Sequence, residues 1–141
     1  MLYSLTTKYA VIALVELARR SSDRPILVKD LAARKEIPAA FLAKLVPPLV
    51  RAGILSSTRG KNGGISFARS PHQTSLADVV RTIEGDNWFR ECVFEVSPCD
   101  GQLDCPLHSV WDPVRDQIIA FLEQTTIGTV ADKLANTKQE A

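Results

Sequence analysis

The chain has 141 residues and a mass of 15.5 kDa, which argues for one compact domain, or a small domain with an oligomerisation arm, and excludes two large catalytic lobes. Hydrophobic residues make up 45% of the sequence and charged residues 23%, which argues against wholesale disorder. The net charge of +1 hides an asymmetry, because 12 Lys or Arg face 4 Asp or Glu up to Pro71, and 5 face 12 after it. The basic first half predicts a polyanionic partner.

The cysteine usage predicts a reducing compartment. Cys92, Cys99 and Cys105 fall within fourteen residues, and an odd, clustered count is a poor disulfide framework. The most apolar stretch, residues 9–18, contains a glutamate and is followed by two arginines. It is too short to span a bilayer and wrongly flanked for a signal peptide, so we expect a cytoplasmic protein.

The basic half predicts three helices. Apolar spacing predicts a helix of about four turns from Thr6 onward, with Thr6 or Thr7 as its N-cap, and a break over residues 21–25. A short helix follows over residues 28–34, and a third begins at Ala39. Two helices joined by a short turn in a basic segment resemble a helix-turn-helix, although any small helical bundle contains such pairs. The apolar face of the third helix comprises Phe41, Leu42, Leu45 and Val46.

A β-hairpin is predicted after the third helix. Gly53 ends that helix, and two β-like runs, residues 54–58 and 65–68, flank a glycine-rich tip at residues 59–64. Such a tip allows close approach to a phosphate backbone or a narrow minor groove, and Arg59 and Lys61 supply the charge. Together with the helix pair, the hairpin predicts a winged helix. The alternative is a surface hairpin with incidental charges.

Two adjacent prolines complicate the third helix. Pro47 and Pro48 predict a kink or an early end near Val46, because proline in a helix interior removes a backbone donor. Base-reading residues would then come from the start of the helix, which is poor in hydrogen-bonding groups. We therefore expect thymine-methyl and wing contacts to carry more of the specificity. The candidate DNA-binding residues are Lys29, Ala39, Ala40, Ala43, Lys44, Arg59, Gly60, Lys61, Asn62 and Gly63.

The acidic half predicts helices separated by a long loop. A fourth helix over residues 75–83, capped by Ser75 and stopped at Gly85, is expected to pack on the first. Residues 86–106 lack periodicity and predict a loop of about twenty residues. Helices are predicted again over residues 107–124 and 126–134. The longer of these has a wide apolar stripe that needs a partner, consisting of Val110, Trp111, Val114, Ile118, Phe121 and Leu122.

The loop carries the candidate metal ligands. Six residues separate Cys92 from Cys99, five separate Cys99 from Cys105, and two separate Cys105 from His108. Thiolates with imidazole suit zinc or an iron–sulfur cluster, and the wide spacing favours a cluster larger than one atom. The alternatives are cysteines buried as small hydrophobes, a histidine that caps its helix, and a redox switch through disulfide formation. The sequence contains no paired carboxylates, nucleophile motif or phosphate loop that would indicate an enzyme.

This combination resembles the Rrf-two family of bacterial winged-helix regulators, whose iron–sulfur members include IscR, NsrR and RirA. The resemblance covers nearly the whole chain. It implies a mostly α fold, a winged helix-turn-helix with a two-stranded wing and a long C-terminal dimerisation helix, and a homodimer that binds a partly palindromic double-stranded DNA operator. It rests on Thr7-Lys8-Tyr9-Ala10, the wing tip at residues 59–64, the segment 76–80 before Glu84-Gly85, the three cysteines, and Thr126-Ile127.

Position by position, the three cysteines match the cluster thiolates of the family. His108 matches the histidine that completes a two-iron (2Fe-2S) cluster in IscR-like members. NsrR-like sensors complete a four-iron (4Fe-4S) cluster with a carboxylate from the partner's first helix. Lys8 occupies that position here, which weakens a nitric-oxide assignment. Ala43 stands where IscR-like proteins carry a glutamate, so their operator sequence is not transferred; Pro48-Leu49 and the wing look closer to RirA-like iron regulators.

The resulting hypothesis divides the chain into a winged-helix DNA-binding domain over residues 1–85, a cysteine-rich cluster loop over 86–106, and a dimerisation helix with a C-terminal arm over 107–141. We expect a dimeric repressor whose operator affinity is gated by an iron–sulfur cluster sensing iron, redox or nitric oxide status. One alternative is a cluster-free regulator gated by thiol oxidation or by a partner protein. The other is a small electron-transfer protein, which would leave the basic half unexplained.

Overall fold

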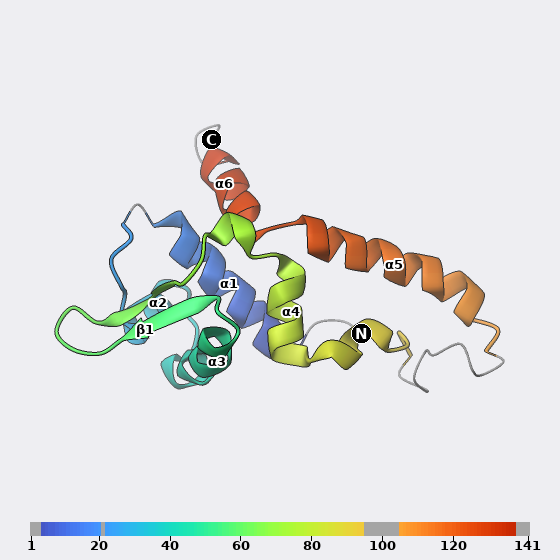
Figure 1. The fold of residues 1–141 in the computed structure, drawn as a ribbon, viewed down its shortest axis with the longest axis horizontal. Helices are drawn as coiled ribbons and strands as arrows, with labels where there is room; N and C mark the ends of the chain where they lie inside the picture. Colours follow the sequence, from blue (N-terminus) through green and yellow to red (C-terminus); the bar gives the residue numbers. More distant parts are fainter. Residues whose placement is uncertain (1–3, 21, 95–104, 138–141) are drawn as a thin grey trace.

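The computed structural model describes residues 4–20, 22–94 and 105–137. It confirms the predicted fold class, which is mostly helical with a two-stranded antiparallel wing (Figure 1). In chain order the elements are α1 (Leu5–Arg19), α2 (Val28–Arg34), α3 (Ala39–Arg51), β1 (Leu55–Thr58), β2 (Gly64–Phe67), the 3-10 helix η1 (Pro71–Gln73), α4 (Leu76–Glu84), the 3-10 helix η2 (Asp86–Arg90), α5 (His108–Gln124) and α6 (Ile127–Thr137).

The main core lies between α1, α2, α3 and the hairpin. Leu14 of α1, Leu31 of α2 and Leu42 of α3 are each at most 2% exposed, and Ile54 closes the core beside the hairpin. Burying side chains of this kind stabilises the fold by about 1.5–3 kcal/mol each. Ile127 of α6 belongs to the same cluster, so the last helix packs on α1.

The first helix starts earlier than its sequence indicates. Ser4, not Thr6 or Thr7, is the N-cap, with extended backbone and a hydroxyl that accepts from the Thr7 N–H at 3.1 Å. Thr7 lies inside α1 and is 1% exposed. The capping prediction was wrong by two to three residues, and Thr7 instead lies in the interface with α4, where its hydroxyl donates to the carboxylate of Glu84.

The prediction that α3 ends near Val46 was also wrong. The helix runs through Pro47 and Pro48 to Arg51. The prolines remove two backbone donors, but the carbonyls that would have accepted from them belong to exposed residues, where water can satisfy them. Leu49 is 2% exposed, so continuing the helix buries another core side chain. Gly53 then adopts a φ of 74°, which ends the helix as predicted.

The wing follows α3 directly. β1 and β2 pair antiparallel from Leu55 opposite Phe67 to Thr58 opposite Gly64. An additional bridge joins Ile26, in the α1–α2 connection, to Ile65 of β2. The wing is therefore attached to the helical core on one edge by α3 and on the other by the α1–α2 connection.

The fourth helix confirms its predicted boundaries. Ser75 caps α4 in a capping box with Asp78, Gly85 ends the helix, and α4 packs on α1. The region predicted as a structureless loop begins instead with η2. Trp88 of η2 is 3% exposed and packs with Val80 and Leu122, so apolar burial orders a segment that has no helical periodicity.

Helix α5 extends away from the winged-helix body, with η2 running toward its N-terminal end (Figure 1). Leu122 at its C-terminal end is buried, whereas Val110 is 70% and Phe121 55% exposed. The predicted apolar stripe thus lies uncovered along much of α5 within the described part of one chain. No helix of the described residues is long and apolar enough to cross a membrane.

Candidate nucleic-acid interface and cysteine segment

The outer face of α3 carries the predicted base-reading residues. Leu42, Leu45 and Val46 are buried, and this fixes the opposite face of the helix toward solvent. The side chains on that exposed face are those predicted from the 3.6-residue period, namely Ala39, Ala40, Ala43 and Lys44. On α2, Lys29 is also exposed.

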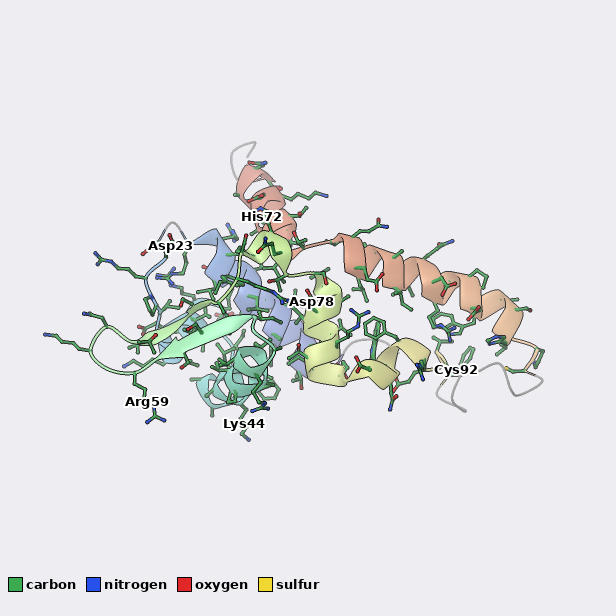
Figure 2. The ribbon with its side chains drawn as sticks, in the orientation of Figure 1. Asp23, Lys44, Arg59, His72, Asp78 and Cys92 are labelled. Carbon is green, nitrogen blue, oxygen red and sulfur yellow. The ribbon has the colours of Figure 1, made fainter. Side chains whose placement is uncertain are left out.

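The wing tip presents two cations on a tight, glycine-rich turn. Arg59, Gly60, Lys61 and Asn62 are exposed, and the Gly63 N–H donates to the Gly60 carbonyl at 3.0 Å. Lys44 on α3 and Arg59 on the wing point to the same side of the molecule (Figure 2). The two elements therefore present positive charge on one face, as expected of a winged helix that binds DNA.

Gly63 differs from its neighbours because it is buried. A Cβ there would lie 2.3 Å from the Thr58 carbonyl oxygen. Its function in the structure is to let the turn close. A tight glycine turn of this kind allows close approach to a phosphate backbone or groove.

Arginines that no sequence motif singled out lie beside the wing. A cleft between the wing tip and the α1–α2 connection is lined in part by Arg20, Arg24 and Arg34 together with Lys61. The only sequence signal was the general excess of basic residues in the first half. Their convergence depends on the Ile26–Ile65 pairing, which joins the connection to β2.

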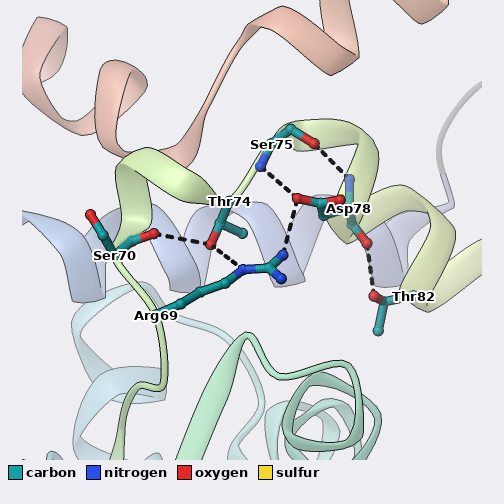
Figure 3. A network of polar contacts seen from close by, with 6 residues as sticks. All are labelled: Arg69, Ser70, Thr74, Ser75, Asp78 and Thr82. Carbon is teal, nitrogen blue, oxygen red and sulfur yellow. Dashed lines mark hydrogen bonds and ion pairs between the residues drawn. The ribbon is translucent and has the colours of Figure 1, made fainter.

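A polar network joins the end of the wing to α4 (Figure 3). Arg69 donates to the Asp78 carboxylate at 3.0 Å and to the Thr74 hydroxyl at 3.3 Å. The same Asp78 oxygen accepts from the Ser75 N–H at 2.9 Å. Because Arg69 follows β2 directly, the wing and the N-terminus of α4 are positioned together.

The C-terminal end of α5 is fixed to the same junction. The Leu76 N–H donates to the Thr125 carbonyl at 2.8 Å, and the Ile127 N–H donates to the Thr74 carbonyl at 2.9 Å. These bonds connect the turn between α5 and α6 to the start of α4. They make the base of α5 part of the winged-helix body.

The cysteine segment, residues 92–105, connects η2 to α5. Cys92 is half-buried two residues after η2, and Cys105 is exposed before α5, where its carbonyl accepts from the His108 N–H at 3.1 Å. Cys99 lies outside the described residues. Trp88 of η2 and Trp111 of α5 belong to one apolar cluster, which holds the flanking elements of the segment together.

The donor chemistry of this segment fits an iron–sulfur cluster. Cys92 and Cys105 are free thiols, and the imidazole of His108 stands at the start of α5. Soft thiolates with one imidazole are the ligands that such clusters accept. Among residues 4–20, 22–94 and 105–137, the His, Cys, Asp and Glu side chains form no group of three or more arranged to hold a metal ion. Cys99, the predicted central ligand, is not among those residues.

Arg81 connects α4 with η2 and α5. From α4, its guanidinium lies 4.6 Å from the ring centroid of Phe89 in η2 and donates to the Glu123 carboxylate of α5 at 3.0 Å. The ion pair is exposed, so its own contribution to stability is small, about 0–1 kcal/mol. Its geometry nevertheless makes Arg81 sensitive to any shift of η2 relative to α5.

Glu84 joins α1 to α4. Burial by itself raises the pKa of Glu84, but hydrogen bonds from the Ser4 and Thr7 hydroxyls and from the Ser4 N–H outweigh that effect and hold the pKa below its ordinary value of 4.5. The ionised carboxylate therefore stabilises the contact between the two helices.

The model of the Rrf2 family, described as iron-dependent transcriptional regulators, matches residues 3–133. This chain belongs to the Rrf2 family. The match confirms the resemblance seen in the sequence. An HTH-type transcriptional regulator from Aquifex aeolicus is 33% identical over 129 residues, covering 90% of this chain and 89% of the relative. IscR of Vibrio campbellii is 29% identical, covering 88% of this chain and 74% of the relative.

Solved structures give the same result. CymR of B. subtilis, described as a global cysteine regulator, superposes with a TM-score of 0.77 at 26% identity, covering 94% of this chain and 98% of CymR. IscR of T. potens superposes with a TM-score of 0.75 at 26% identity, covering 95% of this chain and 88% of IscR. The Rrf2 chain described here is a DNA-binding transcriptional regulator and not an enzyme.

Proposed function

We propose that this chain is a homodimeric repressor whose affinity for a partly palindromic DNA operator is gated by an iron–sulfur cluster held by Cys92, Cys99, Cys105 and His108. The observation that carries the proposal is the position of the described ligands. They flank a segment whose two ends pack, through Trp88 and Trp111, on the helix that follows the wing. The setting is the cytoplasm, where thiols stay reduced.

DNA recognition is assigned to the outer face of α3 and to the wing. In this proposal Ala39, Ala40 and Ala43 contact thymine methyl groups in the major groove, and Lys44 contacts a phosphate. Arg59 and Lys61 enter or flank the minor groove. Lys29, at the start of α2, contacts the backbone. A face poor in hydrogen-bonding groups gives modest base specificity, so DNA shape contributes a large share.

The cluster assignment is supported by the donor set. His108 favours a two-iron cluster, because the partner position that would supply a carboxylate to a four-iron cluster is occupied by Lys8. The description of the family as iron-dependent regulators supports an iron-containing group at this site. When bound, the cluster supplies an iron- and redox-sensitive cross-link between the ends of the segment.

The fold offers a route from this segment to DNA. The C-terminal end of α5 is held to α4 by backbone hydrogen bonds, while its N-terminal end is held by the Trp111 contacts near the ligands. In this proposal, a cluster bound to ligands that precede and begin α5 biases the direction of this helix relative to the winged helix. If the exposed stripe on α5 pairs with a second copy, that direction fixes the spacing of two recognition helices on half-sites about one helical turn apart.

The test begins with anaerobic purification followed by ultraviolet–visible spectroscopy and iron and sulfide assays. We expect brown protein with stoichiometric iron and sulfide, and loss of both in Cys99→Ser. Ser109→Ala, an exposed change one residue from His108, is the matched control and should retain the cluster. Protein that stays colourless and iron-free after anaerobic reconstitution would contradict the cluster assignment.

Gating is tested separately by DNA affinity. An operator is first selected from random DNA duplexes with the cluster-loaded protein. Its affinity is then measured for the cluster-loaded protein, the cluster-free protein and the three Cys→Ser variants. We expect the three Cys→Ser variants to bind like the cluster-free form and unlike the loaded parent. If all three variants bind like the loaded parent, gating is wrong even when the cluster is present.

A cluster-free regulator gated by thiol oxidation is the second candidate. Its support is that Cys92 and Cys105 are free and at least partly accessible, and that the structure of an oxidised form of CymR from Staphylococcus aureus superposes with a TM-score of 0.71 at 27% identity. It predicts colourless protein whose DNA affinity responds to reductant. The electron-transfer alternative predicts no salt-dependent DNA affinity, and the relatives compared above are named as regulators.

A further inference from the structure

A basic cleft lies beside the wing, and its three arginines have no role in the DNA contacts assigned above. We define it by the described residues that line it between the α1–α2 connection, α2 and the wing tip. The charged and polar residues among them are Arg20, Arg24, Asp30, Arg34, Lys61 and Asn62.

The charges of the cleft favour an anion. Four cationic side chains and one carboxylate, that of Asp30, line it. Arg34 is the most compensated cation, since its guanidinium lies 3.9 Å from the Glu16 carboxylate. Arg24 is exposed, and Arg20 is partly exposed. The cleft therefore keeps a net positive charge that a phosphate could neutralise.

Local bonds hold the Arg20 side chain and the backbone of Arg24. The Arg20 guanidinium donates to the Arg24 carbonyl at 3.1 Å, and the Arg24 N–H donates to the Ser22 hydroxyl at 3.2 Å. The connection is fixed to the wing by two backbone bonds between Ile26 and Ile65, of 3.0 and 2.8 Å. Less ordering of the connection and of the Arg20 side chain is then needed when a ligand binds.

The cleft lies on the edge of the wing opposite to α3. α3 contacts β1, whereas the connection pairs with β2. Gly64 permits this approach, because a Cβ there would lie 2.2 Å from the Ile26 carbonyl oxygen. Positive charge is thus found at Lys44 on the outer face of α3, at the wing tip and in the cleft.

We propose that the cleft binds a phosphate of the DNA backbone just outside the half-site, beyond the minor groove that the wing contacts. The proposal rests on the DNA contacts proposed above. DNA is favoured over a free anion because Lys61, Asn62 and Gly63 of the wing tip form one wall of the cleft, so a duplex at the wing continues directly into it. Arginine matches the geometry of phosphate oxygens through paired N–H donors.

The test compares two duplexes in salt titrations. Both contain an operator selected with wild-type protein; one ends at the outer edges of the half-sites, and the other extends about one half-turn of DNA further on each side. Arg24→Ala and the Arg20→Ala/Arg24→Ala double variant are compared with Lys133→Ala, an exposed cation on α6, and with Arg59→Ala in the wing. Thermal unfolding is used to check that each variant is folded.

We expect the wild type to bind the extended duplex more tightly and with a steeper salt dependence than the short one. In the double variant this difference disappears, and the slope of log affinity against log salt falls by about one per phosphate lost. Lys133→Ala leaves both duplexes unchanged, and Arg59→Ala weakens both.

Two outcomes would overturn the proposal. One is that the double variant keeps the wild-type difference between the duplexes. The other is that inorganic phosphate alone stabilises the wild type but not the double variant while duplex length has no effect, which would assign the cleft to a free anion. Failure of the proposed DNA contacts is distinguishable, because the wild type would then bind neither duplex.

Discussion

The winged-helix body and the α5 arm differ in where their apolar surface goes. In the body, α1, α2 and α3 bury their apolar faces against one another, and Leu14 and Leu42 are nearly inaccessible. Along α5, Val110, Val114 and Phe121 stay exposed. A contiguous exposed stripe of this kind marks an interaction surface. The body therefore buries its own apolar surface, whereas the arm leaves apolar surface exposed that the proposed second copy would cover.

The largest expected effect comes from breaking the core of the body while sparing the arm. Leu14→Ala should lower the free energy of unfolding by about 2–5 kcal/mol, because a cavity replaces a fully buried side chain. Phe121→Ala, at a 55% exposed position, should leave monomer stability nearly unchanged and weaken dimerisation instead. Chemical denaturation and sedimentation equilibrium measure the two quantities. Equal loss of unfolding free energy in both variants would contradict the contrast.

The next effect tests how the wing is attached to the body. Gly64→Ala should destabilise the protein by more than about 2 kcal/mol, because the residue has a φ of 137° and its Cβ would collide with the Ile26 carbonyl. Gly60→Ala is the matched control. It also has a positive φ, of 106°, but no atom lies within 4 Å of the added Cβ, so about 1–2 kcal/mol is expected. If thermal unfolding showed that Gly60→Ala destabilises the protein more than Gly64→Ala, the predicted collision with Ile26 would be wrong.

A smaller effect is expected from Arg81, which links the body to the arm. Arg81→Gln removes the contacts with Phe89 and Glu123. We expect the ratio of operator affinities between loaded and cluster-free protein to change by about 0.5–2 kcal/mol, with little change in global stability. Lys133→Gln, on α6, serves as the control. An unchanged affinity ratio in Arg81→Gln would remove this residue from the coupling.

The smallest effect concerns pH. The pKa of Glu84 is lower in the folded protein than in the unfolded chain, so its carboxylate contributes stability above pH 4.5 and loses that contribution as the pH falls through the folded pKa. Glu84→Gln should make stability less dependent on pH in this acidic range. Denaturation midpoints from pH 3 to 7 provide the check, and parallel curves for the variant and the wild type would contradict the assignment.

Much of the candidate DNA interface was predictable because it depends on local patterns. The 3.6-residue period placed Ala43 and Lys44 on the exposed face of α3, and the glycine-rich tip identified the wing. The α1–α2 arginines were not predictable in this way. Arg24 and Lys61 are 37 positions apart in the chain, and only the pairing of Ile26 with Ile65 brings their segments together.

The sequence by itself determined the helix and strand pattern, the charged wing and the cysteine spacing, because periodicity, glycine and ligand chemistry are local properties. Only the tertiary structure decided where the chain departs from those local patterns. It carries α3 through Pro47 and Pro48, since burial of Leu49 offsets lost backbone donors. It orders η2 around Trp88 without any helical period, and it packs α6 on α1. In each case long-range burial of apolar surface outweighs the preference of the local sequence.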